Sequence, residues 1–591
     1  MGLMAILSLS AAAKGIDEEA ARMKAEAFMK RQLGMAQEVK MRRVKAAASL
    51  SAGALFGAGE GGEQPLYIFN REGGGYVIVS GDDRTFDILG YGYKGEVDID
   101  RMPANMRSWL EAYAEAIASF DEHEDAIVAE GASRAKRVIE PRMKTQWDQG
   151  DPYNLTVPYF RYLGRTQSGG MGWVEEPCVT GCAATAAAQV MYYHRYPDAV
   201  LIDLEGYKND NSFMVQVGNS VTNATVNNTE PVAAGSPIDW DNMLLTYENG
   251  GYTQEQALAV AHLMQYLGTA FKMQYGLSSG AYGSNVLSGV EKAFGYSDAY
   301  VVFKDETDTY EEWIDCVYNE VEKAEVVVLA GQSNEGGHMF VLDGYEGEDF
   351  FHVNWGWGGY LDGYFRLLTM DPGIHQGTGG TTSGYEDDQY ILAGLGKGGK
   401  GATTREKAFL CRGLTAGELG QTYMVTGDSY MFPDFELSFY NANFSELKAY
   451  AGLGVYDANG NLVYEATMGS SILSVPLGSG YRFSNTYLTI PASVLKNGVY
   501  SLLPLSSTST SNPKTWRTMH HGEQMGIDIT VANGRATLSK HTPTAIYAPQ
   551  VVQPEADSDD TWRTLDGRIL NGKPATPGVY LHGSRKVLVS K

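Results

Sequence analysis

One cysteine of the chain, Cys182, has the sequence surroundings of a catalytic nucleophile. It directly follows Thr180-Gly181, a turn and capping signal, and it opens an alanine-rich run that Pro197 stops. These signals predict a helix with Cys182 in its first turn. Unpaired backbone N–H groups and the positive end of the helix dipole favour a thiolate there, which is the form that covalent catalysis uses. For an arbitrary cysteine, a structural role at the start of a core helix is the commoner interpretation.

The other cysteines give no sign of a disulfide framework or a metal site. The chain has four cysteines in 591 residues, which is too few for a disulfide scaffold. Cys178 lies four residues before Cys182, and no Cys or His pair of matching spacing lies nearby to complete a zinc site. We interpret Cys178, which precedes the helix, as structural, and we expect no cofactor and no metal.

A thiol nucleophile needs a general base, and the chain has ten histidines. His194 is on the same predicted helix, but at 1.5 Å per residue it lies about 18 Å along the axis from Cys182. Five others fall outside residues 142–400: His123, His520, His521, His541 and His582. The remaining candidates are His262, His338, His352 and His375.

His338 is the preferred base because a polar partner is predicted beside it. It lies in a strand opened by two glycines, and the next predicted strand carries Asn354. If Leu342 pairs with Phe350, His338 lies opposite Asn354, with the Cβ atoms about 5 Å apart. The Asn amide could then hold the imidazole in the tautomer and orientation that a thiolate needs.

Two more side chains could complete this site. Trp355 follows Asn354 and could shield the contact between histidine and asparagine from water. Gln149 lies in a turn upstream of the nucleophile, where its amide and the backbone N–H of Cys182 could form a two-donor oxyanion hole. The predicted register leaves His352, the rival base, without a polar neighbour, which favours a structural role for it.

Composition and charge limit the classes of function. The formal net charge is −25, and residues 142–400 carry −21 of it. Such a segment repels phosphate backbones, so nucleic acid is excluded as a partner. No run approaches 18 apolar residues, so no membrane-spanning helix is expected. With 43% hydrophobic residues the chain can bury a core and is not grossly disordered.

Before residue 142 the patterns predict a leader and a small α+β unit. Residues 1–13 resemble part of a signal peptide without its basic region, although a plain apolar start is the alternative. Helical spacing follows, with one predicted stripe formed by Ile16, Ala20, Met23, Ala27 and Met29. Segment 66–80 reads as a β-hairpin and 106–120 as a helix. The basic stretch after residue 132 is a suitable proteolytic site.

After about residue 401 the pattern changes to short strands. Asn459-Gly460 between two apolar runs is a strong hairpin signal, and the spacing predicts a β-sandwich over 401–550. An acidic linker and a short terminal segment occupy 551–591. This segment resembles the sorting tails on exported proteins of some Gram-negative bacteria, with a plain β-hairpin as the alternative.

Several segments closely resemble the streptopain family of secreted bacterial cysteine peptidases. They are 147–154 (WDQGDPYN), 181–185 (GCAAT) with 189–191 (QVM), 336–338 (GGH), and 352–359 (HVNWGWGG) with 362–366 (DGYFR). The front segment 66–83 resembles the inhibitory propeptide of that family. The resemblance implies a papain-like fold, a zymogen, and cleavage within 134–144.

The resemblance also implies roles for individual residues. Cys182 is the nucleophile and His338 the general base and acid, Gln149 is the oxyanion donor, and Asn354-Trp355 support the histidine. Gly337 and the loop 278–283, with Ala281 and Tyr282, belong to the substrate cleft. Tyr282 stands where small residues are usual in the family, so we expect it to narrow the cleft or to change the side chains accepted.

The sequence therefore predicts an α+β architecture with five parts. They are a partial signal peptide at 1–13, a propeptide at 14–141, a papain-like peptidase domain at 142–400, a β-sandwich at 401–550, and a linker with a sorting tail at 551–591. The predicted function is that of a secreted cysteine endopeptidase acting on proteins or peptides and inhibited by its own propeptide. The alternatives are transglutaminase-like acyl transfer, and a surface adhesin on a papain-like scaffold.

Overall fold

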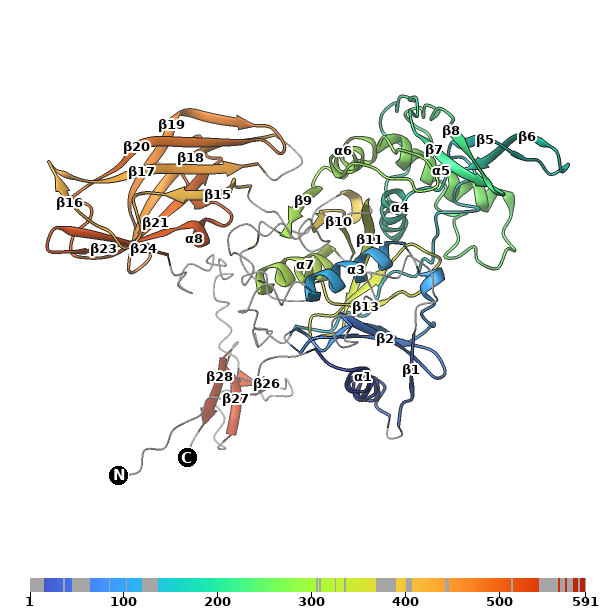
Figure 1. Ribbon diagram of the computed structural model, residues 1–591, viewed down its shortest axis with the longest axis horizontal. Coiled ribbons are helices and arrows are strands. Elements are labelled where there is room, and N and C mark those ends of the chain that lie inside the picture. The colour runs from blue at the N-terminus through green and yellow to red at the C-terminus, as the bar shows by residue number, and fades with distance from the viewer. Residues whose placement is uncertain are drawn as a thin grey trace.

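A computed structural model describes most of the chain (Figure 1). It covers residues 15–35, 38–44, 64–83, 85–102, 104–118, 136–304, 307, 310–324, 326–333, 336–367, 389–399, 407–441, 446–511 and 514–541, with short strands between 562 and 589. The predicted signal peptide and His375 lie outside the described residues, as does the junction before residue 136.

The front of the chain forms the small α+β unit that its sequence predicts. Its elements are α1 (Glu18–Gln32), β1 (Met41–Arg43), β2 (Leu66–Arg71), β3 (Tyr76–Ser80), β4 (Ile88–Gly92) and α3 (Ala104–Ala118). The predicted hairpin is confirmed, because β2 pairs with β3 from Leu66↔Ser80 to Asn70↔Tyr76. Gly73 to Gly75 make the turn with φ of 89° to 106°, a region that glycine enters without strain.

The predicted apolar stripe of the first helix was wrong. The buried residues of α1 are Ala21, Ala25, Phe28 and Met29, whereas Met23 is 62% exposed. The helix begins after Asp17, whose carboxylate accepts the N–H of Ala20 at 2.8 Å. Packing against β2 and β3 buries the face of α1 that carries Phe28. Of the buried residues of α1, only Met29 belongs to the predicted stripe.

The front unit and the middle of the chain share one antiparallel sheet. Its order is β1-β2-β3-β4-β13-β12-β11-β10-β14-β9. The strands of the middle segment are β9 (Tyr300–Phe303), β10 (Val327–Ser333), β11 (Gly336–Tyr345), β12 (Phe351–Asn354), β13 (Gly363–Phe365) and β14 (Tyr390–Ala393). The seam between the two parts is the pairing of β4 with β13, through Tyr91↔Tyr364 and Gly90↔Phe365.

Aromatic side chains reinforce this seam. Tyr91 stacks on Tyr364 with ring centroids 5.3 Å apart. Tyr91 and Tyr93 both donate hydrogen bonds from their hydroxyls to the carboxylate of Glu346, which follows β11. On the other face of the sheet, Trp109 of α3 packs edge-on against Phe340 at 5.5 Å. The front unit is therefore held by side chains more than by its short stretch of paired backbone.

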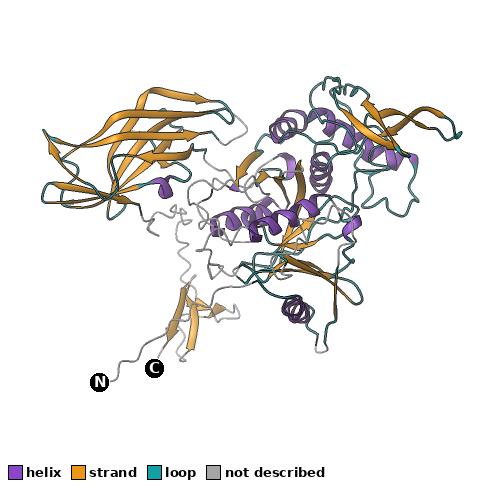
Figure 2. Ribbon diagram, viewed as in Figure 1, coloured by secondary structure: helices purple, strands orange, loops and turns teal. Residues whose placement is uncertain are grey.

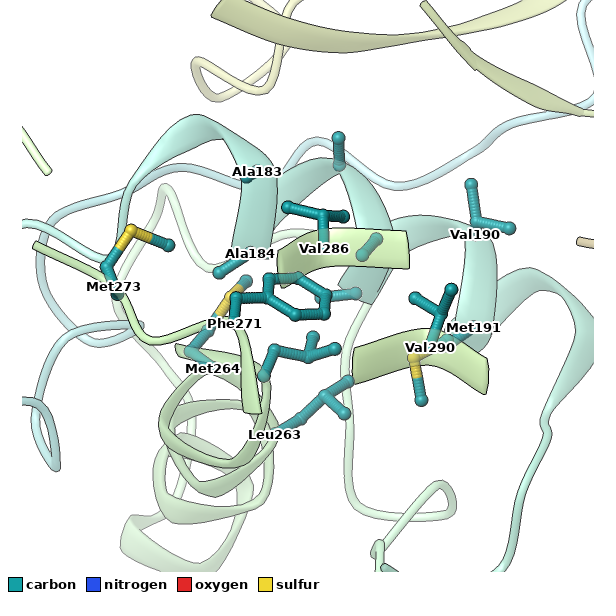
Figure 3. Packing of buried hydrophobic residues seen from close by; sticks show 14 of the residues in the cluster. Ala183, Ala184, Val190, Met191, Leu263, Met264, Phe271, Met273, Val286 and Val290 are labelled. Atoms are coloured by element: carbon teal, nitrogen blue, oxygen red, sulfur yellow. The ribbon is translucent and has the colours of Figure 1, made fainter. Parts of the chain in front are cut away.

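Helices cover both faces of the sheet. On the side of Cys182 they are α4 (Cys182–His194), α5 (Gln254–Ala270) and α6 (Gly283–Phe294), and on the opposite face the sheet is covered by α7 (Tyr310–Ala324). Figure 3 shows how the small side chains of α4 admit close neighbours: Leu263 and Met264 of α5, Phe271, and Val286 and Val290 of α6 gather against it. Close packing of this kind fixes the helix position, and with it the position of its first residue.

A second, four-stranded sheet lies beside these helices. It is formed by β5 (Tyr159–Arg165), β6 (Met171–Pro177), β7 (Ser212–Val217) and β8 (Ser220–Val226), in the order β6-β5-β8-β7. Figures 1 and 2 show it projecting from the helical side of the molecule.

Residues 407–541 form a β-rich module with its own hydrophobic core. Its strands are β15 (Leu410–Thr415), β16 (Thr422–Thr426), β17 (Ser429–Tyr440), β18 (Leu447–Asp457), β19 (Leu462–Val475), β20 (Gly480–Pro491), β21 (Gly498–Ser507), β22 (Arg517–Thr518), β23 (Ile527–Ala532) and β24 (Arg535–Lys540), with a short helix α8 (Gly522–Met525). Two antiparallel layers, joined through β16, face this core, as a sandwich requires. The predicted hairpin at Asn459-Gly460 is confirmed as the β18–β19 turn.

The end of the chain contains β25 (Trp562–Arg563), β26 (Ile569–Leu570), β27 (Gly578–His582) and β28 (Arg585–Val589), which form a small sheet. Across the described ranges, every helix falls short of the length and apolar character that crossing a membrane requires.

Candidate active site

Cys182 is the first residue of α4, as the sequence predicts. The preceding Gly181 has φ 87°, and a Cβ on it would lie 2.8 Å from the carbonyl oxygen of Ser279. Only glycine allows both that backbone conformation and that close approach. The approach brings the turn around Ser279 against the start of the helix, so the nucleophile candidate lies beside the loop predicted to form the substrate cleft.

The strand-like segment before Cys182 binds two neighbouring segments through its backbone. The N–H of Thr180 donates to the carbonyl of Gln149 at 3.1 Å, and the N–H of Val179 donates to Gly276 at 3.2 Å. The hydroxyl of Ser279 donates to the carbonyl of Val179 at 2.7 Å. These bonds hold the Gln149 turn and the 276–280 turn on either side of the chain that leads to the thiol.

A cavity of about 440 Å³ brings Cys182 and His338 together. His338 lies in β11 opposite Gly331 of β10, and the N–H of the next residue, Met339, donates to Cys182 Sγ at 3.4 Å. Ala281 and Tyr282, predicted cleft residues, line the same cavity. Its other lining residues are Ala183, Gln274, Gly280, Gly283, Ser284, Phe303, Ala330, Gly331, Met339, Tyr390 and Leu477.

Burial keeps both the thiol and the imidazole neutral. Cys182 is 9% exposed, and burial raises the pKa of its thiol, against hydrogen bonds from the N–H groups of Met339, Ala183 and Cys182 that lower it. Burial also lowers the pKa of His338 to about 4. The predicted thiolate-favouring field of the helix end is therefore outweighed by desolvation of the Cys182 thiol in this structure.

The predicted register between the strands of His338 and Asn354 was wrong. Asn354 lies opposite Val341, and the ladder shifts at a bulge between Leu342 and Gly344. The chain turns through Glu346 to Phe350, with Gly347, Glu348 and Asp349 in left-handed conformations, so β12 starts later than the predicted pairing assumed. Asn354 is thus not the direct cross-strand partner of His338.

The amide of Asn354 instead joins the sheet to the helix of Cys182. Its Oδ1 accepts from Gln189 Nε2 and from the N–H of Gly356, each at 3.0 Å, and its Nδ2 donates to the carbonyl of Thr145 at 2.9 Å. The hydroxyl of Thr145 donates to Gln189 Oε1 at 2.6 Å. Gln189 therefore has a positioning function that residue-by-residue reading of the sequence did not assign.

Trp355 is buried behind this network, at 1% exposure. Its indole N–H donates to the carbonyl of Leu361 at 3.1 Å, and its ring packs on Phe340 with centroids 4.7 Å apart. Trp109 of the front unit lies 6.4 Å from it, edge to face. Trp355 therefore links strand β12 to the propeptide-like unit.

His352 does have a polar neighbour, contrary to the prediction. Its Nδ1 lies 2.6 Å from Oδ1 of Asp343, a residue with no exposed surface. The negative charge of Asp343 raises the pKa of His352 against the lowering effect of burial. The predicted register did not include the bulge between Leu342 and Gly344, and the pairing of His352 with Asp343 depends on that bulge. Its place away from the cavity lining agrees with the structural role predicted for His352.

The remaining predicted site residues lie outside the lining of the cavity. Gly337 adjoins His338 in β11, opposite Gln332. In the described part of the chain Gln149, Asn354 and Trp355 are outside the cavity lining. Phe303, Tyr390 and Leu477 line it without having been predicted, because nothing in their local sequence marks them as cleft residues.

Within the described ranges, no three His, Cys, Asp or Glu side chains gather in a way that could hold an ion. None of the four cysteines is in a disulfide, and burial raises the pKa of the Cys178 thiol to about 12.

Comparison with known proteins agrees with the geometry. The Peptidase C10 family profile matches residues 147–365, and the Spi protease inhibitor profile matches residues 13–117. Streptopain of Streptococcus pyogenes is 34% identical over 334 residues, which is 56% of this chain and 80% of that protein. The thiol protease/hemagglutinin PrtT of Porphyromonas gingivalis is 29% identical over 363 residues, 59% of this chain and 39% of that protein.

Among solved structures, a fragment of Prevotella intermedia prointerpain A is similar, with 26% identity and a TM-score of 0.46. The match covers 61% of this chain and 99% of that fragment. The streptopain match favours hydrolysis over the acyl-transfer and adhesin alternatives. By its identity to streptopain over most of that protein, the chain belongs to the peptidase C10 family, as a cysteine peptidase with an inhibitor propeptide.

Proposed function

We propose that the chain is a secreted endopeptidase that cleaves proteins through a thioester formed on Cys182, with His338 as general base and acid. The observation that carries the proposal is the single cavity lined by both side chains, with the thiol at a helix N-terminus. A C10 peptidase needs a thiol and an imidazole at one substrate-sized opening, and pockets of about 300–1,000 Å³ hold ligands of that size.

The chemical steps use the two side chains in turn. His338 takes the proton of the Cys182 thiol as the sulfur attacks the scissile carbonyl, and it gives that proton to the leaving amine as the C–N bond breaks. Water, deprotonated by His338, then attacks the thioester carbonyl and releases the acid product and the thiol. Because burial keeps both groups neutral before attack, the proton passes from the Cys182 sulfur to His338 as the new C–S bond forms.

Gln149 and the backbone of Cys182 are the proposed donors to the oxyanion. The N–H of a residue in the first helical turn has no intrahelical acceptor, so the N–H of Cys182, which here contacts its own sulfur, can turn to a substrate oxygen when the sulfur attacks. Gln149 is held near this position by the bond between its carbonyl and Thr180. Asn354 and Trp355 position β12 and α4, and so act on the site through Gln189 and the sheet.

Of the three residues proposed to contact substrate, Ala281 and Tyr282 line the cavity, and Gly337 precedes His338 in β11. Tyr282 precedes α6 and is 67% exposed, so its ring can cover part of a bound peptide. Extended polypeptides are the substrate class that such an open wall accepts. The charge of residues 142–400 favours cationic substrates.

The front unit is the proposed intramolecular inhibitor, released by cleavage within 134–144. Part of that junction is ordered: Ile139 exchanges backbone hydrogen bonds with Tyr345 at 2.7 and 2.8 Å. Bonds before residue 139 are therefore better placed for cleavage than those inside the paired stretch. Export by the 1–13 leader, and sorting by the tail over 551–591, are parts of the proposal that rest on sequence alone, as do the domain boundaries.

The decisive experiment uses the full chain, activated by its own processing, with an epoxysuccinyl thiol probe and casein plus a labelled primary amine. We expect casein fragments, probe attached to Cys182 by mass spectrometry, and loss of both in Cys182→Ala. Cys316→Ser, which changes a thiol outside the site, is the matched control and should retain activity. Labelled intact casein, or proteolysis that persists in Cys182→Ala, would contradict the proposal.

A further inference from the structure

One wall of the Cys182 cavity comes from the C-terminal β module. Leu477 lies in the turn between β19, which ends at Val475, and β20, which starts at Gly480, and it lines the same cavity as Cys182 and His338. In Figure 1 the adjoining ends of β19 and β20 point toward the side of the molecule that carries α6 and β9. No other part of the module contributes to the described lining.

The path of the chain places the module beside α6. Gly399 abuts the end of this helix so closely that a Cβ on it would lie 2.3 Å from the carbonyl oxygen of Gly295. Where the described chain resumes, the positive charge of Lys407 acts on Glu291 of α6, opposing the burial that raises the pKa of that carboxyl. The close approach of Gly399 and the charge of Lys407 thus place the chain that enters the module along the helix whose first residues, Gly283 and Ser284, line the cavity.

The turn that carries Leu477 is held firmly by a buried asparagine. The side chain of Asn441, with no exposed surface, donates to the carbonyl of Val475 at 2.9 Å. The backbone of Asn441 also bonds to Gly478 and Ser479, at 3.0 and 2.9 Å. A turn tied by three such bonds presents Leu477 in one position and loses little entropy when a substrate packs against it.

Leu477 limits the cavity but does not fill it. With the leucine in place, about 440 Å³ remains open, and Leu477 itself is 41% exposed. A side chain that blocked the site would be buried among its partners and leave little volume. Phe303 and Tyr390, whose rings lie 5.2 Å apart, add further apolar surface to the same cavity.

We propose that Leu477 is a specificity-determining residue, through which the C-terminal module limits the size of the apolar side chain that a peptide substrate can place in this cavity. Side chains that extend across the cavity meet Leu477, so we expect aliphatic side chains to be accepted more readily than the largest aromatic ones. This inference rests on the proposed function and extends it, because it gives the module a role in selecting substrates.

The kinetic test compares Leu477→Ala and Leu477→Trp in the full chain after its own activation. The substrates are peptides that differ at a single position, which carries Ala, Leu, Phe or Trp, scanned on both sides of the scissile bond. Leu419→Ala is the matched control, because Leu419 is an exposed leucine of the same module, at 53%, outside the cavity lining.

Leu477→Ala should raise the kcat/KM ratio of the Trp peptide to the Leu peptide by about tenfold at one position, and Leu477→Trp should lower it by a similar factor. The control should keep the wild-type ratio. Ratios that stay equal in all variants, or an active species that has lost residues 407–541, would overturn the inference. Absence of hydrolysis of every peptide by the wild-type chain would contradict the proposed function instead.

A cross-linking test then checks the geometry independently of activity. In a Cys182→Ala, Cys316→Ser background, Leu477→Cys combined with Ser284→Cys should form an intramolecular bridge with a short bismaleimide. Leu419→Cys with Ser284→Cys should form none. A bridge in neither pair would overturn the inference even if the proposed function holds.

Discussion

Gln189 Nε2 donates a hydrogen bond of 3.0 Å to Oδ1 of Asn354, and both side chains are buried. Gln189 lies two turns beyond Cys182 on α4, while Asn354 ends β12 in the sheet that also carries His338. The bond therefore joins the two elements that must keep thiol and imidazole at one cavity. Buried amides cannot replace a lost partner with water, so the pair is sensitive to change on either side.

Gln189→Met should destabilise the protein and impair catalysis together. The substitution keeps the volume but removes the bonds to Asn354 and Thr145, so we expect a loss of about 1–3 kcal/mol in the free energy of unfolding. The measurement is urea unfolding in a Cys182→Ala background, with kcat/KM measured separately on the active enzyme.

Gln216→Met is the control, because Gln216 is exposed and its side chain bonds only to the Gly218 carbonyl among the contacts described. Equal stability of the two variants would contradict a positioning role for Gln189.

Gly181→Ala should lower the free energy of unfolding by more than the penalty for its backbone conformation alone. Gly181 has φ 87° and Gly169 has φ 85°, but a Cβ clashes at 2.8 Å only at Gly181, while Gly169 has open space around it. Both variants place alanine at a positive φ, which costs about 1–3 kcal/mol. In Gly181→Ala the clash with Ser279 adds to that penalty, so we expect a larger loss of stability and of kcat/KM. If Gly169→Ala proves equally harmful, the close approach does not matter.

The pair of His352 and Asp343 should make stability fall as pH rises. Asp343 raises the pKa of His352 above its unfolded value, so its contribution is fully present below about pH 6.5 and is lost as pH passes through the folded pKa. Burial also raises the pKa of Asp362 to about 7, and this carboxyl likewise binds its proton more tightly in the folded state. The raised pKa values of His352 and Asp362 therefore both make stability fall as pH rises.

The measurement is urea unfolding of Cys182→Ala with and without His352→Phe, at pH 5.5 and pH 9. We expect the substitution to destabilise more at pH 5.5 than at pH 9. His262→Gln provides a contrast of opposite sign, because burial lowers the pKa of His262. A larger loss at pH 9 in His352→Phe would refute the argument.

Ionic strength should affect cleavage of cationic substrates selectively. Residues 142–400 carry −21 of the formal charge, so a Lys-rich peptide is attracted before it binds. Raising the salt concentration from about 10 mM to 150 mM shortens the Debye length from about 30 to 8 Å and should lower kcat/KM for that peptide. A neutral peptide of equal length should show no such change, and parallel responses of the two would remove the electrostatic explanation.

Local signals in the sequence predicted much of the framework. A glycine, a run of alanines and a proline were enough to predict the helix that starts at Cys182, and turn residues were enough for the hairpins at 66–80 and 453–464. Each of these depends on residues close together in the chain. The helix register of α1 failed because its buried face is chosen by the sheet on which it packs.

Features that depend on distant segments could not be predicted in this way. A bulge at Leu342 and Gly344 moved Asn354 away from its expected partner and placed His352 beside Asp343. Tyr390 and Leu477 reach the cavity from other parts of the chain, and no local pattern marks them. The thiol pKa also depends on burial by these segments, so the helix dipole alone indicated the wrong direction.

The seam between β4 and β13 has a consequence for release of the propeptide. Among the described residues, Tyr91↔Tyr364 and Gly90↔Phe365 pair across it and the N–H of Arg366 donates to the carbonyl of Leu89, so few backbone hydrogen bonds must break there when the two parts separate. The seam is also held by rings, by the tyrosine hydroxyls on Glu346 and by a hydrophobic core that both parts share. The strand left behind, Gly363–Phe365, is three residues long, too short to recruit another chain as a β-partner. Separation of the front unit therefore breaks a shared hydrophobic core more than a backbone ladder, and it leaves only a short strand edge behind.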